Sequence, residues 1–241
     1  PMDEELSKEL QQAFEKRKVK FHLSTKVTAV RDGKVIAEHE GEQLEIPFDK
    51  LLVSVGRRAV TDALGLETVG VELQRGAIVV DEHLETSVPG IYAVGDVNGV
   101  SMLAHTAARE GQVAVHHITD YPDAMSYRAI PGIVYTDPEI ASVGQTEQEL
   151  RTTGVDYQVH RVPMSLSGRF VIENEQGNGF CKLLTDSEGV ILGAHMLGNG
   201  SSEILVPAIM AVEQRMTLTE LTRIVFPHPT VSEIVRVAAL S

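Results

Sequence analysis

Cysteine is almost absent from this 241-residue sequence, and two motifs of redox and nucleotide-binding proteins are absent altogether. The single cysteine, Cys181, cannot form a disulfide within the chain, so any dithiol chemistry needs a second chain. There is no C-x-x-C pair. There is also no G-x-G-x-x-G motif, so the turn that binds a dinucleotide pyrophosphate is not found in these residues.

The sequence also lacks an excess of positive charge and a long apolar run. Its 34 acidic and 21 basic side chains give a net charge of −13, which disfavours binding to phosphate backbones and anionic lipids. The longest apolar stretch, 204–212, is much shorter than the roughly 20 residues of a membrane span, and the acidic first residues do not resemble a signal peptide. We therefore expect neither a nucleic acid nor a membrane as a partner.

The size and composition suit a globular protein. At roughly 100–200 residues per domain, the length predicts one or two domains. A hydrophobic content of 43% is enough for a core. The sequence begins with Pro1 rather than methionine, as a processed product or an excised fragment would.

The first fifty residues predict a helix followed by short antiparallel strands. Apolar side chains at helical spacing predict a helix over 3–17, and residues 19–23 alternate like a half-buried strand. Asp32-Gly33 separates two alternating stretches. This dipeptide is a strong hairpin signal, because the turn needs positive φ at both central residues. A further strand over 44–46 completes a small meander.

Two apolar runs farther along predict strands that are buried on both faces, as in a parallel sheet. Residues 51–55 end at Gly56, and residues 91–96 end in a carboxylate. A third short strand is predicted over 78–81. Residues 102–118 contain several alanines and few helix breakers, which predicts a helix.

The composition changes near 121–123, which indicates a domain boundary. Beyond it, strands come first and most helices come last, which favours an α+β domain with an antiparallel sheet. The predicted strands lie near 140–143, 157–162, 180–184 and 190–196, and the predicted helices at 147–151, 202–215, 218–224 and 231–240.

Asp96 is the first candidate site residue. A carboxylate directly after a buried strand lies at the sheet edge where open α/β sheets bind ligands. There Asp96 would accept hydrogen bonds from sugar or ribityl hydroxyls, and Gly95 would let the ligand approach the backbone. The alternative is an ordinary Gly-Asp turn. The helix predicted from Met102 favours binding, because free amides at a helix start attract a carbonyl.

His228 and Glu233 form the second candidate pair. Pro229 keeps His228 extended just before a predicted helix, and a carboxylate five residues on could fold back to the imidazole, fix its tautomer and raise its basicity. The alternative is structural, because Thr230-x-x-Glu233 also matches a capping box. The adjacent His116 and His117 point in different directions on a helix and have no ligands at metal spacing, so no metal site is expected.

In this order and spacing, the motifs resemble the C-terminal half of the dihydrolipoamide dehydrogenases, a branch of the pyridine nucleotide-disulfide oxidoreductases. The resemblance covers essentially the whole chain. The motifs that carry it are Met2-Asp3-Glu4-Glu5, Val55-Gly56-Arg57-Arg58, Thr86 to Asp96, Met102-Leu103-Ala104-His105, Tyr135 to Glu139 with Ser142-Val143-Gly144, and His228 to Glu233.

The resemblance implies a fold class and a division of the chain. Residues 1–85 would be the second part of an NAD domain and residues 86–123 the returning part of an FAD domain. These α/β remnants would precede an α+β interface domain over 124–241, which makes such enzymes homodimers. Sequence outside this chain would be needed to complete both the FAD and the NAD sites.

The resemblance also implies roles for individual residues. Asp96 would bind the ribityl chain of the flavin, and the amides around Leu103 and Ala104 would face the isoalloxazine carbonyl. The other implied cofactor-binding residues are Gly56, Gly95, Met102 and His105. His228 and Glu233 would form the acid–base dyad for the dithiol of the partner subunit.

The expected activity is oxidation of the dihydrolipoamide of a 2-oxoacid dehydrogenase complex by NAD⁺, through FAD and a disulfide that these residues lack. The isolated chain is expected to be inactive. The expected location is cytoplasmic, or the mitochondrial matrix in a eukaryote. Two alternatives stay open: a dimerisation fragment without enzymatic activity, and a related disulfide reductase such as glutathione reductase.

Overall fold

The computed structural model describes residues 2–175 and 177–241. The chain forms two compact units. The C-terminal unit combines the residues up to Lys20 with Tyr127–Ser241, and the middle unit is Phe21–Ser126. Each unit is described by itself. Among the described residues, no helix combines the length and the apolar character needed to cross a membrane.

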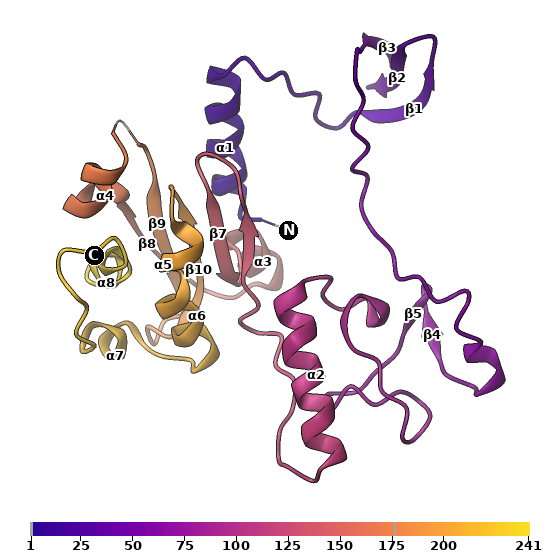
Figure 1. Ribbon diagram of the computed structural model, residues 1–241. Coiled ribbons are helices and arrows are strands. Elements are labelled where there is room, and N and C mark those ends of the chain that lie inside the picture. Colours follow the sequence, from indigo (N-terminus) through magenta and orange to yellow (C-terminus); the bar gives the residue numbers. More distant parts are fainter. Residues whose placement is uncertain (1, 176) are drawn as a thin grey trace. The chain divides into compact units, whose positions relative to one another are not determined.

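A five-stranded antiparallel sheet forms the centre of the C-terminal unit (Figure 1). Its strand order is β6-β7-β10-β9-β8. The strands are β6 (Gly132–Val134), β7 (Ile140–Gly144), β8 (Gln158–Pro163), β9 (Phe180–Thr185) and β10 (Ile191–Leu197). The helices of this unit are α1 (Glu4–Lys16), α3 (Glu147–Thr153), α4 (Gly168–Glu173), α5 (Ser201–Ile204), α6 (Val206–Glu213), α7 (Leu218–Thr222) and α8 (Glu233–Ala239), with a 3-10 turn η3 (Met164–Leu166).

Helices cover both faces of this sheet, so nearly every residue of the central strands β7, β10 and β9 is buried. Residues of α6 and α8 pack with Val143, Leu183 and Met196 in the main core. On the opposite face, Leu6 of α1 packs with Phe180 and other apolar side chains of the strand ends. Every residue of β9 is buried, Cys181 included. The α+β fold with an antiparallel sheet that was predicted for this part of the chain is confirmed.

A buried cluster of charges ties α1 to the sheet. The ammonium group of Lys182 is fully buried and lies 2.7 Å from Asp3, 3.0 Å from Glu5 and 2.6 Å from Glu147. Asp3 is also the N-cap of α1, where its carboxylate accepts a hydrogen bond from the Glu5 amide. The three carboxylates pair with the buried ammonium group, because burying an unpaired charge away from water would cost much free energy.

A second buried polar group, His195, lies on β10 with both ring nitrogens engaged. Nε2 donates to the Gln145 carbonyl at 3.0 Å, because a carbonyl can only accept. Nδ1 therefore accepts from the Ser142 hydroxyl at 2.5 Å. Burial lowers the pKa of His195 below its ordinary value, although the nearby Asp3 carboxylate opposes that shift. The ring is thus held in its neutral form.

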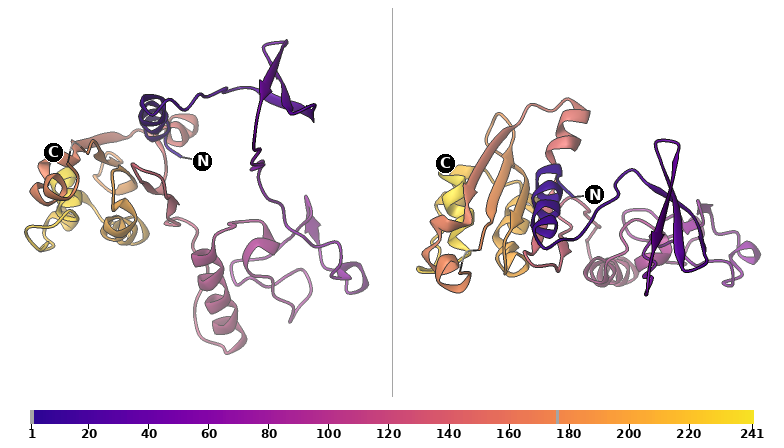
Figure 2. Two further views of the ribbon diagram at one scale, coloured as in Figure 1. Left: turned by 45° about the horizontal axis from the view of Figure 1, so that its top comes forward. Right: turned by 90° about the horizontal axis from the view of Figure 1, so that it is seen from above.

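The middle unit contains the predicted hairpin meander (Figure 2). Strands β1 (Lys26–Arg31), β2 (Lys34–His39) and β3 (Glu42–Pro47) are antiparallel neighbours. Arg31 pairs with Lys34, so Asp32 and Gly33 form the turn, with φ of 52° and 69°. The rest of the unit holds η1 (Leu66–Thr68), β4 (Leu73–Gln74), β5 (Ala77–Ile78), η2 (Gly95–Asn98) and α2 (Ala104–Ile118).

Three predicted strands of this sequence are wrong. Residues 19–23 and 51–55 form no strand. Residues 91–96 form only an isolated bridge at Tyr92, and their last two residues belong to η2. Leu52 and Val55 are 89% and 91% exposed. A strand buried on both faces needs neighbouring strands for its backbone groups, and no described strand pairs with residues 51–55.

Several predicted boundaries also shift. The helix expected over 202–215 is divided into α5 and α6, with Pro207 in the first turn of α6. The strand expected over 78–81 is reduced to the short β5, with one isolated bridge at Val80. The helices expected from residues 102 and 231 begin at Ala104 and Glu233. Strand β6 and helix α4 were not predicted.

Candidate active site

His228 and Glu233 contact one another across the loop that connects α7 to α8. Nδ1 of His228 lies 3.1 and 3.0 Å from the two carboxylate oxygens of Glu233. The His228–Pro229 peptide bond is cis. The imidazole is 80% exposed, whereas the Glu233 side chain is only 19% exposed. The pair therefore presents its ring to the outside and keeps its acid against the protein.

This geometry fixes the tautomer of the exposed ring. A carboxylate can only accept, so Nδ1 of His228 carries the hydrogen toward Glu233. Nε2 then has a lone pair on the exposed side of the ring, and the carboxylate stabilises the imidazolium when that lone pair takes a proton. The arrangement is suited to general acid–base chemistry on a group that approaches from outside the chain.

The capping-box alternative is not formed here. Helix α8 begins at Glu233 itself, after the N-cap Ser232, which makes no side-chain cap. The Thr230 hydroxyl donates to the Pro227 carbonyl, at 2.8 Å, instead of accepting from a helix amide. The Thr230 amide does reach Glu233, at 3.4 Å. Glu233 thus binds one backbone amide and the imidazole together.

Apolar surface surrounds this pair. A groove of about 290 Å³ beside it is lined by Val206, Met210, Phe226 and their neighbours. Val225 and Met210 are 92% and 61% exposed. A hollow of about 380 Å³, lined in part by His228 and Glu233, also contains Arg236 in its wall. Exposed apolar surface next to polar groups is typical of a protein–protein contact.

In the middle unit, Gly95 and Asp96 begin η2. The Gly95 amide donates to the buried Glu110 carboxylate at 2.5 Å, and the same carboxylate accepts from the Asn98 amide group at 3.0 Å. Gly95 has φ of 79°, and a Cβ there would lie 3.2 Å from that of Ala107. The turn is therefore held by two hydrogen bonds to Glu110, and the side chain of Asp96 is exposed.

No sequence motif indicated the role of Glu110. It lies six residues after Ala104, the first residue of α2, and only the fold brings it against Gly95 and Asn98. A buried carboxylate that holds a backbone amide fixes the backbone beside Asp96.

The predicted residues before and at the start of α2 are accessible. Leu103 is the N-cap of α2 and makes no side-chain cap. Leu103, Ala104 and His105 are exposed, and Met102 is half-buried. An uncapped helix start presents amide groups and the positive end of the helix dipole. Its chemistry therefore suits a carbonyl oxygen.

Gly56 lies apart from regular structure. It is exposed, with φ of 107°, and an added Cβ would meet nothing within 4 Å. Arg57 and Arg58, which follow it, line a cavity of about 590 Å³ together with Asn98 and Met102. The structure thus brings the segment after Gly56 to the neighbourhood of η2, although Gly56 itself is not in the lining.

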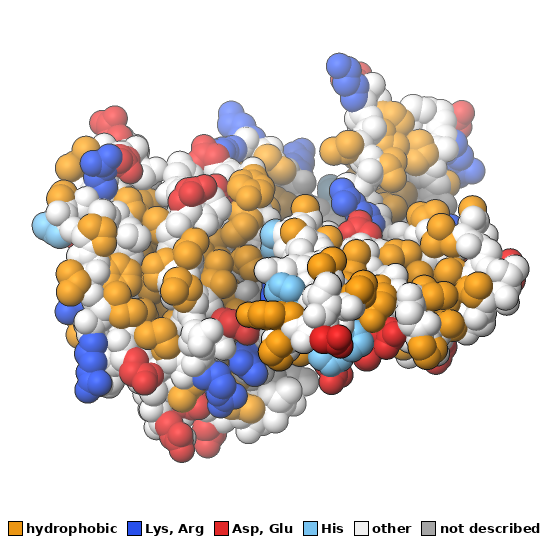
Figure 3. All heavy atoms as spheres, turned by 60° about the horizontal axis from the view of Figure 1, so that its bottom comes forward, with side chains coloured by type: hydrophobic (Ala, Val, Ile, Leu, Met, Phe, Trp, Pro, Cys, Tyr) orange, Lys and Arg blue, Asp and Glu red, His pale blue; other side chains and the backbone are white. Residues whose placement is uncertain are grey.

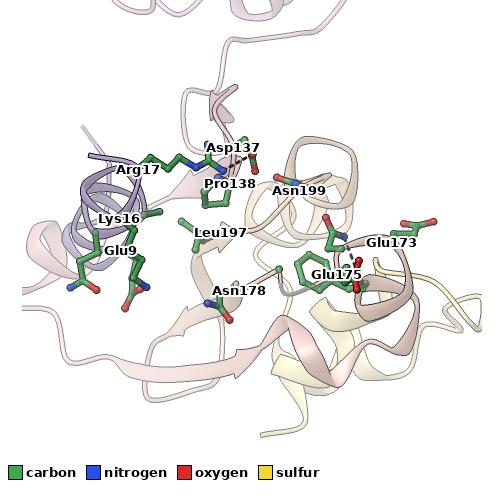
Figure 4. Close-up of a pocket in the computed structure, with 15 residues that line it drawn as sticks. Glu9, Lys16, Arg17, Asp137, Pro138, Glu173, Glu175, Asn178, Leu197 and Asn199 are labelled. Atoms are coloured by element: carbon green, nitrogen blue, oxygen red, sulfur yellow. Dashed lines mark hydrogen bonds and ion pairs between the residues drawn. The ribbon is translucent and has the colours of Figure 1, made fainter. Parts of the chain in front are cut away.

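Another cavity lies in the C-terminal unit, and its lining includes none of the predicted site residues. It has a volume of about 560 Å³ and is bordered by α1, α4 and the loop before β7. Arg17 reaches across to Asp137 and contacts its carboxylate at 2.6 Å (Figure 4). Charged and amide side chains dominate its walls.

Two family models match the chain. The model described as "Pyridine nucleotide-disulphide oxidoreductase" matches residues 1–111, and its "dimerisation domain" model matches residues 130–239. The chain belongs to the pyridine nucleotide-disulphide oxidoreductases. The resemblance noted from the sequence motifs is thereby confirmed.

Among the curated relatives that match the chain are dihydrolipoyl dehydrogenases. The chain is 40% identical to a mitochondrial dihydrolipoyl dehydrogenase of Dictyostelium discoideum, covering 99% of this chain and 51% of the relative. It is 37% identical to the dihydrolipoyl dehydrogenase of Cupriavidus necator, covering 99% of this chain and 52% of the relative. The chain spans about half the length of the curated relatives it matches.

Two solved structures are similar in fold to this chain. LpdA from Mycobacterium tuberculosis matches with a TM-score of 0.83 and 29% identity, over 100% of this chain and 53% of that one. The flavoprotein disulfide reductase RclA from Escherichia coli matches with a TM-score of 0.81 and 27% identity, over 96% of this chain and 54% of that one.

Proposed function

We propose that the chain supplies the acid–base pair of a flavin- and NAD-dependent enzyme that oxidises dihydrolipoamide. The observation that carries the proposal is the exposed imidazole of His228, hydrogen-bonded through Nδ1 to the largely covered Glu233. The identity of about 40% to dihydrolipoyl dehydrogenases supports this choice of substrate.

The pair acts on a thiol. A thiol with a pKa near 8.5 is a weak nucleophile until it is deprotonated. Nε2 of His228 takes the proton of one dihydrolipoamide thiol, and Glu233 stabilises the resulting imidazolium. The thiolate sulfur then attacks one sulfur of a protein disulfide, which forms a mixed disulfide and releases the other sulfur as a thiolate. That disulfide lies outside these 241 residues, whose single cysteine is the buried Cys181.

The described residues of the middle unit fit a flavin in chemical type. Asp96 offers an exposed carboxylate to ribityl hydroxyls, beside the backbone that Glu110 holds at Gly95. The uncapped start of α2 at Leu103 and Ala104 offers amide donors to a carbonyl. We propose that Gly56, Met102 and His105 complete this side of the site. When bound, the flavin accepts two electrons and passes a hydride to NAD⁺.

We further propose that two copies of this protein form a homodimer through residues 124–241, so that His228 serves the partner's disulfide. The apolar groove beside the pair and the matching dimerisation domain support this arrangement. Residues 1–85 and 86–123 would then belong to the NAD and FAD domains. The relatives are mitochondrial and bacterial enzymes, which supports the mitochondrial matrix or the bacterial cytoplasm as the location.

The test is the kinetics of flavin-loaded enzyme containing this chain, with dihydrolipoamide and NAD⁺ as substrates. His228→Gln removes the proton acceptor, so we expect turnover to fall about 10²–10⁴-fold while the flavin absorbance is retained. Glu233→Gln should lower turnover less. Near-normal turnover of His228→Gln would refute the role of the pair.

A control separates catalysis from helix capping. If Glu233 acted only as a structural group, Glu233→Gln would cost about 0.5–2 kcal/mol of stability and leave the kinetics unchanged. Thr230→Val removes a neighbouring hydroxyl that contacts the Pro227 carbonyl and the Ser232 hydroxyl but not the imidazole. It should therefore change stability without changing turnover.

The substrate is tested with the same enzyme. Activity with glutathione disulfide and NADPH, but none with dihydrolipoamide, would favour the glutathione reductase alternative. The non-enzymatic alternative predicts a colourless dimer. A protein that contains this chain and is as long as the curated relatives would then still bind no flavin.

A further inference from the structure

The fully described loop 223–232 carries the acid–base imidazole and connects α7 to α8 without regular structure of its own. Two of its side chains, Phe226 and Val231, pack against the main core. Two other apolar side chains are uncovered, because Ile224 and Val225 are 46% and 92% exposed. Figure 3 shows exposed apolar side chains of this kind on the face that it brings forward. A loop with so few buried contacts needs hydrogen bonds to keep a fixed geometry.

Ser167 supplies such a hydrogen bond from elsewhere in the C-terminal unit. Its hydroxyl donates to the carbonyl of Thr230 at 3.1 Å, although the two residues are 63 positions apart. Among the hydrogen bonds of the described residues, no other joins loop 223–232 to a part of the chain outside the loop, α7 and α8. Ser167 is 1% exposed, so this bond is shielded from water and is stronger than it would be at the surface.

The hydroxyl of Ser167 is itself held in a defined direction. Ser167 is the N-cap of α4, and its Oγ accepts a hydrogen bond from the Phe170 amide at 3.2 Å. An amide N–H can only donate, so Oγ keeps its single hydrogen for the Thr230 carbonyl. The Ser167 amide donates to the Met164 carbonyl at 2.9 Å. Met164 and Phe170 are both buried in the main core, so the donor is attached to closely packed residues.

Thr230 connects this donor to the acid–base pair. The Thr230 amide donates to Oε2 of Glu233 at 3.4 Å, and the same oxygen lies 3.0 Å from Nδ1 of His228. Because the anchored carbonyl and this amide belong to one residue, holding the carbonyl restrains the amide as well. The contacts therefore run from Ser167 through Thr230 and Glu233 to the imidazole.

We infer that Ser167 is a positioning residue for the acid–base pair, an inference that rests on the proposed function of that pair. Ser167 holds the Thr230 backbone so that the Glu233 carboxylate stays against Nδ1 of His228. Within the described residues, the Ser167 hydroxyl makes no hydrogen bond to the imidazole or the carboxylate, so it acts only through Thr230. Such positioning matters, because a displacement of about 1 Å can lower a rate about 100-fold.

The test uses the flavin-loaded enzyme that contains this chain. Ser167→Gly removes the donor to Thr230, while glycine is a fair N-cap and changes the start of α4 little. We expect kcat/KM for dihydrolipoamide to fall about tenfold. Oxidation of NADH by ferricyanide passes electrons through the flavin without deprotonating a dihydrolipoamide thiol, so its rate should be retained. Ser167→Thr keeps a hydroxyl and should recover most of the lost kcat/KM.

Thr146→Gly is the matched control. Thr146 is also a buried N-cap residue of the C-terminal unit, on α3, and its hydroxyl contacts Glu149. Its loss should leave kcat/KM for dihydrolipoamide unchanged. A double variant separates positioning from general damage. In His228→Gln the imidazole is absent, so adding Ser167→Gly should lower the remaining rate no further.

Circular dichroism and flavin absorbance check that each variant is folded. If Ser167→Gly does not fold, Ser167→Ala, which lacks the donor but keeps the Cβ, gives the same test. Unchanged kcat/KM in the folded variant would overturn the role of Ser167. An equal loss of ferricyanide reduction, or the same fold-loss when Ser167→Gly is added to His228→Gln, would also overturn it.

The two proposals fail in different ways. Near-normal turnover of His228→Gln would refute the proposed function, and the role of Ser167 with it. An impaired His228→Gln together with an unimpaired Ser167→Gly would refute the positioning role alone.

Discussion

Removing the positive charge of Lys182 should destabilise the C-terminal unit more than almost any other single change. Lys182→Met keeps a side chain of similar length but leaves three carboxylates without the cation they share. Asp3 is almost fully covered, and Glu5 and Glu147 are 32% and 20% exposed. Their oxygens lie within 4.8 Å of one another, so the repulsion is added to the cost of burying them.

The magnitude follows from this burial. Breaking a buried ion pair by removing one partner costs about 3–5 kcal/mol, since an uncompensated charge is left behind. Glu5 and Glu147 retain Arg161 at 2.7 Å and Arg151 at 3.7 Å, which moderates the loss at these two positions. Within residues 2–175 and 177–241, Asp3 has no such second cation among its ion pairs. Against a typical total of about 5–15 kcal/mol, a loss near 3 kcal/mol is large.

Urea unfolding followed by circular dichroism measures this loss. Arg17→Met is the matched control, because its pair with Asp137 is short but 51% and 65% exposed, and it should cost less than about 1 kcal/mol. The double variant Lys182→Met with Asp3→Asn should recover part of the stability. If Lys182→Met costs no more than the control, or if the second substitution gives no recovery, the reasoning is wrong.

Other consequences of the packing can be tested in the same way. Burial lowers the pKa of His195, so on acidification the unfolded state binds a proton near pH 6.5 before the folded state does. The free energy of unfolding should therefore fall as the pH drops below about 6.5, and this pH dependence should be smaller in His195→Gln. Gly193→Ala would place a Cβ 2.1 Å from the Gln145 carbonyl and should cost at least about 1–3 kcal/mol, whereas Gly168→Ala, with nothing within 4 Å, should change urea stability by less than about 0.5 kcal/mol. Gly33→Ala puts a side chain at φ of 69° and should cost about 1–2 kcal/mol, visible as faster amide exchange in β1 and β2.

Features that depend on neighbouring residues were predictable from the sequence. The Asp32-Gly33 turn needs only two residues that tolerate positive φ between alternating strands, and the hairpin formed as predicted. The contact between His228 and Glu233 likewise spans five residues, so the local chain path brings it about. The sequence did not decide whether Glu233 also caps a helix, because that depends on the residue at which α8 begins.

Features that depend on distant partners were not predictable. Residues 51–55 have the composition of a buried strand, but composition does not supply the neighbouring strands that such a segment needs. Lys182 stands in an apolar run, and nothing nearby in the sequence shows that Asp3 and Glu147 will surround it. The stacking of His117 on His83 was not predictable either, because His83 lies more than thirty positions earlier in the chain.

The burial of Cys181 has a practical consequence for following the motions of this protein. Its thiol lies at 0% exposure in β9, and burial raises its pKa to about 12, so the reactive thiolate is scarce in the closed fold. Since it is the single thiol of the sequence, its labelling by a chromogenic disulfide reports one event, the separation of the central sheet from its covering helices. At high reagent concentration the labelling rate would therefore approach the rate at which this unit opens under native conditions. No engineered probe is needed.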